Sequence, residues 1–161
     1  MFRSLALVAA LAVPAIATAA PVGSPANYVM KAGASDLYEI TSSRLVMSSR
    51  NPRVRDFARE MVRDHTQSTA EVKAAARRAH LRPAPPHLNP MQTRMVSQLR
   101  RTSGAARDRL YVQQQKQAHA MALDLHRSYA NRGTPAPLRM AASHIVPVVQ
   151  GHRDMLRDMP M

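Results

Sequence analysis

Long segments with helical spacing of apolar residues, separated by proline-containing stretches, constrain this chain more than any other feature. Ser24-Pro25 and Asn51-Pro52 each join a capping side chain to a proline in the first helical turn, which is a strong helix-start signal. No segment alternates apolar and polar residues for long enough to predict a strand. The predicted helices cover about residues 25–49, 52–79, 90–100, 105–131 and 135–158.

The connections between these helices predict how they pack. Short turns join the first two long helices and the last two, whereas a proline-rich stretch over residues 81–90 separates the two pairs. Since short turns place neighbouring helices antiparallel, we expect a single all-α domain over residues 24–158. The expected fold is a four-helix bundle with one crossover connection that carries a short extra helix. A three-helix or open arrangement is the alternative.

Residues 1–19 have the composition of a cleaved secretory signal peptide. Arg3 precedes an apolar run over residues 5–16, and the small residues that end at Ala19 fit the cleavage rule. The run is shorter than the roughly 20 residues that span a bilayer, so we predict no transmembrane span after the signal is removed. We therefore expect a periplasmic or secreted protein, with an uncleaved anchor as the alternative.

The composition excludes several chemistries. The chain has no cysteine, which rules out disulfides, thiol nucleophiles and thiolate metal sites. Its five glycines are scattered, and neither a phosphate-binding glycine loop nor a Gly-x-Ser-x-Gly nucleophile motif is present. We identify no catalytic residues, so the sequence favours a non-enzymatic role without deciding the question.

The net charge of +13 is a second strong signal, and 20 of the 23 basic residues are arginine. Such a charge favours anionic partners, here lipid head groups or acidic polymers of the cell envelope. Nucleic acid is disfavoured because aromatic residues, which form base-stacking platforms, are few and tryptophan is absent. The simpler alternative is that the arginines cover solvated helix faces.

Two histidines interrupt apolar stripes that should face a core. His65 shares one face of its predicted helix with apolar neighbours, and His152 lies on the corresponding face of the last helix. A buried imidazole needs a hydrogen-bond partner or a metal ion, because leaving it unpaired costs about 1–3 kcal/mol. The two stripes are Val54, Ala58, Met61, His65, Thr69, Val72 and Ala76, and Leu138, Ala141, Ile145, Val148, His152 and Met155.

Each of the other two long helices adds one candidate metal ligand, at a similar distance from the start of its helix. Glu39 lies on a face of small residues, and His119 flanks an apolar stripe. Three imidazoles and one carboxylate would suit a single ion of zinc, copper, iron or manganese. The candidate metal ligands are therefore Glu39, His65, His119 and His152. The alternatives are a purely hydrogen-bonded layer, with Glu39–His65 and His119–His152 pairs, or exposed histidines.

Asp64 is predicted to face a helix seam, where it could accept a hydrogen bond from an arginine or from a metal-binding imidazole. The Glu-x-x-His motifs of diiron bundles are absent, because valine stands three residues before both His65 and His152. The remaining histidines lie in polar contexts and are expected at the surface; they are His80, His87, His126 and His144.

The order of these residues resembles an exported bacterial family catalogued as domain-of-unknown-function family 4142. The resemblance spans about residues 28–156 and departs from the family at Arg107, where members usually have phenylalanine. It implies a ferritin-like bundle in the periplasm or outer envelope, with no established activity. The matching residues are Glu39, the motif Val54-x-x-Phe57-Ala58-x-x-Met61-Val62-x-Asp64-His65-Thr66, and then Asp108-x-x-Tyr111, His119, Pro147 and His152.

The sequence supports three functional hypotheses. The first is a non-catalytic exported ferritin-like protein whose mid-bundle histidine–glutamate layer is structural or binds a metal ion. The second is a basic module that binds anionic lipids or polymers of the envelope. The third is a periplasmic metal-handling or redox protein.

Overall fold

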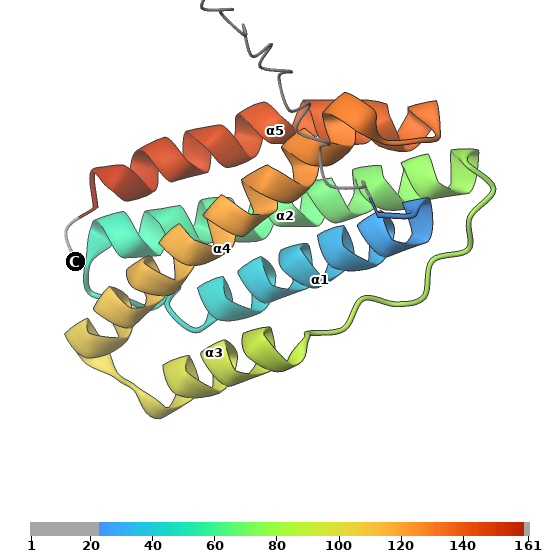
Figure 1. Ribbon diagram of the computed structural model, residues 1–161. Helices are drawn as coiled ribbons and strands as arrows, with labels where there is room; N and C mark the ends of the chain where they lie inside the picture. Colours follow the sequence, from blue (N-terminus) through green and yellow to red (C-terminus); the bar gives the residue numbers. More distant parts are fainter. Residues whose placement is uncertain (1–22, 160–161) are drawn as a thin grey trace, which may run out of the picture.

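The computed structural model describes residues 23–159, which form five helices and, within that range, no strand (Figure 1). The all-α class expected from the sequence is therefore confirmed for this part of the chain. The signal peptide predicted over residues 1–19 lies outside the described residues. The helices are α1 (Pro25–Arg44), α2 (Pro52–Arg78), α3 (Pro90–Arg101), α4 (Gly104–Arg132) and α5 (Ala136–Arg157).

Side-chain caps followed by proline start the first three helices. The Ser24 hydroxyl accepts a hydrogen bond from the backbone N–H of Asn27 at 3.2 Å, and the Asn51 side chain caps α2 in the same way. At the start of α3, Asn89 and Gln92 form a reciprocal capping box. These caps satisfy amide groups that the first helical turn leaves without partners.

α1 ends at Arg44 rather than near residue 49. The backbone N–H groups of Leu45 and Val46 donate to the carbonyls of Ser42 and Ser43, which tightens the chain into a turn. Val46 nevertheless packs into the core. Its burial explains why apolar spacing alone extended the predicted helix into the turn.

The four long helices form a closed ring of contacts around the bundle axis. α1 packs against α2 and α4, and α5 packs against the same two helices. Figure 1 shows that the long helices in contact with each other are antiparallel, whereas α2 and α4 run in the same direction and lie diagonally opposite each other. The chain between α2 and α4, residues 79–103, must therefore return along the bundle, and its helix α3 packs against α1 and α4. This is the ferritin-like arrangement with one crossover, and it excludes the three-helix and open alternatives.

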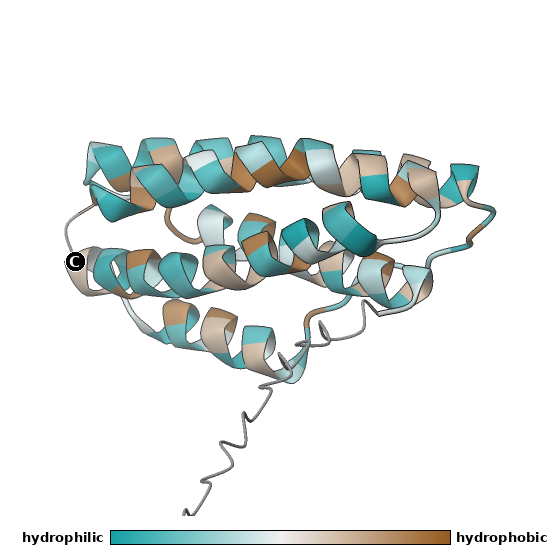
Figure 2. Ribbon diagram, turned by 45° about the horizontal axis from the view of Figure 1, so that its top comes forward, coloured by the Kyte–Doolittle hydropathy of each residue, from teal (hydrophilic) through white to brown (hydrophobic). Residues whose placement is uncertain are grey.

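Apolar side chains fill both ends of the bundle and leave a polar layer between them. Figure 2 shows hydrophobic residues recurring at intervals along the helices between hydrophilic ones, as expected for amphipathic helices. One apolar cluster includes Tyr28, Val72 and Leu138, and the other includes Val54, Tyr111 and Leu156. On α2, α4 and α5 buried polar residues separate the two clusters, and on α1 they lie between the first cluster and Val46 of the second. These residues include Asp36 and Glu39, His65, Gln115 and His119, and His152.

The inward face of α5 differs by one position from the predicted stripe. Val148 is exposed, and Val149 takes the buried place between Ile145 and His152.

Among the described residues, no helix is long and apolar enough to cross a membrane.

Packing at the centre of α4 yields the first testable prediction. Leu123 is fully buried in the first apolar cluster, so Leu123→Ala is expected to lower the free energy of unfolding by about 2–5 kcal/mol. Met140→Ala, at a position that is 58% exposed, is the control and should change it by less than about 0.5 kcal/mol. Urea unfolding measures both; equal effects would contradict the described core.

Candidate metal centre

α2 places His65 in the core with one ring nitrogen paired and the other free. Nδ1 lies 2.8 Å from Oδ1 of Asp36 in α1, and the second oxygen of Asp36 accepts from the Thr69 hydroxyl at 3.0 Å. Nε2 is buried and has no hydrogen-bond partner. Because a carboxylate can only accept, this pairing puts the proton of a neutral His65 on Nδ1 and leaves a lone pair on Nε2.

α4 holds His119 in the corresponding tautomer through a different acceptor. Its Nδ1 lies 3.0 Å from the backbone carbonyl of Gln115, one helical turn earlier. A carbonyl oxygen only accepts, so Nδ1 carries the proton and Nε2 presents a lone pair. This Nε2 lies 3.3 Å from Nδ1 of His152.

His152, in α5, lies between two acceptors. Its Nε2 is 3.0 Å from Oδ2 of Asp64, and its Nδ1 faces the lone pair of His119. Burial lowers the pKa of His152 to about 4, although Asp64 opposes the shift, so near pH 7 the ring is neutral and has a single N–H. That proton can serve only one contact. Donation to the carboxylate, the stronger acceptor, leaves two lone pairs facing each other between His119 and His152.

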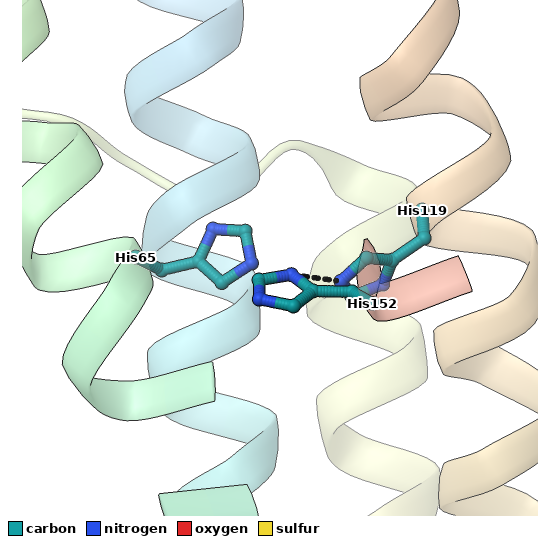
Figure 3. A group of neighbouring side chains, drawn as sticks. All are labelled: His65, His119 and His152. Atoms are coloured by element: carbon teal, nitrogen blue, oxygen red, sulfur yellow. Dashed lines mark hydrogen bonds between the residues drawn. The ribbon is translucent and has the colours of Figure 1, made fainter. Parts of the chain in front are cut away.

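The three histidines, which we call the histidine group, meet in the middle of the bundle (Figure 3). One ring nitrogen of each lies within 4.8 Å of those of the other two, and the ring centroids are 5.3, 5.5 and 5.6 Å apart. Two imidazole nitrogens bound to one tetrahedral ion at about 2.0–2.1 Å would lie about 3.3–3.4 Å apart. The separation of 3.3 Å between His119 and His152 fits this geometry.

The pKa values of the other two members of the group shift in opposite directions. It lowers the pKa of His119 well below its usual value, and the neighbouring His65 and His152 add to the effect. Burial also acts to lower the pKa of His65, but the hydrogen bond and charge of Asp36 raise it overall. His65 is therefore the member for which a proton competes most strongly with a metal ion.

Glu39, the fourth ligand predicted from the sequence, lies beside the histidine group but is not a member of it. Its Oε1 is 3.7 Å from Nδ1 of His119, the nitrogen that donates to Gln115, and both of its oxygens are buried without a hydrogen-bond partner. Burial raises the pKa of Glu39 to about 7, against the opposing effect of His65. A buried carboxyl without a hydrogen-bond donor is a sign that this layer lacks a positive charge, as are the facing lone pairs of His119 and His152.

The hydrogen-bonded pairs differ from those expected for a purely structural layer. Glu39 and His65 are not paired, because Asp36 occupies the partner position on His65. The contact between His119 and His152 is present. The difference arises because Asp36 lies one helical turn before Glu39 and so shares its inward face of α1.

Asp64 lies where α2 meets α5 and has two neighbours. Oδ1 accepts from Nε of Arg63 at 2.9 Å, and Oδ2 faces His152. Its side chain is 19% exposed, whereas that of Asp36 is 2% exposed. Asp64 is thus the most exposed carboxylate in direct contact with the histidine group.

Sequence reasoning missed two buried polar residues near the group. Asp36 is absent from the predicted ligands, although its spacing from Glu39 places it on the same helix face. The prediction that His126 lies at the surface was wrong, because its ring is buried with Nδ1 3.0 Å from the Tyr28 hydroxyl. The available signal was its position seven residues after His119, two helical turns along the same face.

The fold and the buried histidine layer define the class of protein, a ferritin-like helical bundle with a polar centre. The sequence match is more specific. The chain matches DUF4142, described as a domain of unknown function, over residues 10–159, and it belongs to this family. A comparison with curated proteins gave no match.

Two solved structures of DUF305 proteins are similar to this chain. One is from Streptomyces coelicolor and has been assigned as a secreted protein; it has a TM-score of 0.70 and 13% identity over 83% of this chain and 90% of its own. The other, a fragment from Deinococcus radiodurans, has a TM-score of 0.71 and 15% identity over 83% and 92% of the two chains. At such identities the similarity shows the shared fold alone.

The burial of His126 predicts a pH dependence of stability. Burial lowers its pKa from the usual 6.5 to about 4, so between these pH values the unfolded chain binds a proton that the folded chain does not. Stability therefore falls as pH falls from about 6.5 to 4, and this site contributes up to about 3 kcal/mol. His126→Gln should flatten the dependence, measured by urea unfolding in a chelating buffer. The exposed His144→Gln is the control; equal slopes for the two variants would contradict the assignment.

Proposed function

We propose that this protein is exported and binds one transition-metal ion through the histidine group. The observation that carries the proposal is the convergence of three buried ring nitrogens, while the second nitrogen of each ring faces an oxygen acceptor. Such acceptors fix the tautomer and orientation of histidines in metal sites. They are Asp36 for His65, the Gln115 carbonyl for His119 and Asp64 for His152.

The charge around the histidine group supports a cation at its centre. Carboxylate oxygens lie 2.8, 3.7 and 3.0 Å from nitrogens of the three rings. Uncompensated charge in a protein interior costs several kcal/mol, so acidic side chains around the neutral rings of His119 and His152 favour a positive partner. A bound cation would supply that charge and accept the lone pairs of the histidine group.

The donor atoms narrow the class of ion. Neutral imidazole suits zinc, copper and other late first-row metals, whereas magnesium and calcium prefer oxygen ligands. The absence of Glu-x-x-His motifs leaves the bundle centre without the ligands of a diiron pair. We therefore infer a mononuclear site for zinc or copper.

The surroundings of the site favour binding over catalysis. Five cavities open on the described part of the chain, and none of them is lined by a member of the histidine group. A substrate would therefore need an opening that these cavities do not provide. The proposed role is to hold one ion, for structure or for metal handling.

The proposed location is the periplasm or the extracellular space. It is supported by the signal peptide predicted over residues 1–19, and by a structural neighbour that has been assigned as secreted. Copper and zinc are both compatible with an exported protein whose ligands are imidazoles rather than thiolates.

The metal site predicts stoichiometric binding. Protein purified without chelator should contain about one zinc or copper ion per chain, measured by elemental analysis. Chelator-stripped protein should gain about 2.7 kcal/mol of stability when free Zn²⁺ is 100 times the dissociation constant. His119→Leu should abolish this gain because it removes one ligand.

His144→Leu is the matched control for this experiment. It also removes a histidine that contacts a carboxylate, here Glu71 at 2.9 Å, but at an exposed position outside the histidine group. It should retain full metal binding. If wild-type protein binds no metal, the proposal fails. His65→Leu then tests the hydrogen-bonded layer, which predicts a loss of stability because Asp36 loses its partner.

Glu39→Gln separates charge compensation from coordination. If Glu39 only compensates charge, Zn²⁺ affinity should fall by about 10–100-fold while one ion still binds at saturation. Loss of binding comparable to that of His119→Leu would make Glu39 the fourth ligand expected from the sequence. In metal-free protein above pH 7 the variant should be more stable than wild type, by up to about 3 kcal/mol, because the pKa of about 7 means that the folded chain must bury a charge there.

A further inference from the structure

A metal ion needs a path to the proposed site, because the histidine group is closed off by the four long helices. The three rings are at most 3% exposed. The Nε2 of His65 is buried and has no hydrogen-bond partner, so an ion must reach it inside the bundle. An ion must therefore first meet side chains that reach both solvent and a member of the group.

In the described part of the chain, only the edge between α2 and α5 offers such side chains among the carboxylate neighbours of the histidine group. The side chains of Asp36 and Glu39 are 2% and 0% exposed, whereas Asp64 is 19% exposed. Glu60 lies one helical turn before Asp64 on α2, and its side chain is 34% exposed. Carboxylate exposure therefore increases from the group toward the surface along the seam between α2 and α5.

Glu60, Asp64 and His152 form a second set of metal-ligand atoms that lie within 4.8 Å of one another. This set differs from an ordinary surface acidic cluster because His152 is also a member of the histidine group. Its Nε2 faces Asp64, and its Nδ1 faces Nε2 of His119. One ring therefore connects an outer, oxygen-rich set with an inner, nitrogen-only set.

We propose that divalent metal ions reach the histidine group through this seam, with Glu60 and Asp64 capturing the ion and His152 leading it inward. The inference rests on the proposed metal site and assigns its route of loading. Hard carboxylate ligands bind a hydrated ion weakly and can exchange it, whereas three imidazoles hold a late transition metal more strongly. The buried, unpartnered His65 nitrogen is independent support for a ligand at the inner end of the route.

Arg63 occupies the outer set in the absence of metal. Its side chain lies 2.9 Å from Asp64 and 3.7 Å from Glu60, and it is 67% exposed. Exposed ion pairs of this kind are weak, so an incoming divalent ion can displace the guanidinium. Arg63 thus competes with the ion for the two carboxylates and slows loading.

Stopped-flow mixing of the chelator-stripped full chain with Zn²⁺, followed with a fluorescent zinc indicator, tests the route. Glu60→Gln is expected to slow loading by about tenfold, because it removes the outer charge that attracts the ion. Its equilibrium affinity should stay within about twofold of wild type, because Glu60 is not among the hydrogen-bond or ion-pair partners of His65 or His119. Arg63→Ala should have the opposite effect and load faster than wild type.

Glu71→Gln is the matched control. Glu71 is also on α2 and contacts α5, but through the exposed His144 rather than through His152. It should load at the wild-type rate. Equal slowing by Glu71→Gln, or wild-type rates for both Glu60→Gln and Arg63→Ala, would overturn the route while leaving the site intact. Absence of equilibrium Zn²⁺ binding in wild-type protein would instead overturn the proposed site itself.

Discussion

The hydrogen bond between Asp36 and His65 is the contact on which the polar layer depends. It joins α1 to α2 at 2.8 Å and assigns Nδ1 of the ring to the carboxylate. Nε2 must then face the centre of the bundle, where α4 and α5 bring two more imidazoles with their own outer nitrogens engaged. The layer therefore contains more acceptors than protons, and this imbalance makes a cation the simplest partner for it.

The apolar clusters on both sides of the layer increase the free-energy cost of having more hydrogen-bond acceptors than protons in it. α2, α4 and α5 each pass from one cluster through the polar layer into the other, so bulk water has little access to the three imidazoles or to Asp36 and Glu39. In such surroundings an unpaired polar atom is costly, and a correctly paired one is held more strongly than at the surface. The same packing that makes the metal-free layer unfavourable would stabilise a bound ion.

Much of the fold could be predicted from the sequence because its signals are local. Proline starts, helical spacing and one long connection indicate an all-α bundle with a crossover. His65 and His152 were identified because each interrupts an apolar stripe. Asp36 and His126 share helix faces with Glu39 and His119, but their hydrogen-bond partners lie in other helices. Helical spacing alone cannot show that His65 pairs with Asp36 rather than with Glu39. The end of α1 escaped prediction because the turn after it is also partly buried.

The histidine group draws on both halves of the chain. His65 belongs to the first helical hairpin, α1 with α2, whereas His119 and His152 belong to the second, α4 with α5. The two hairpins are joined in sequence by one crossover, but an ion held by all three rings would be a second connection between them, independent of the backbone. Loading such an ion would therefore couple the docking of the hairpins to metal supply, so that the assembled core and the occupied site become one cooperative unit.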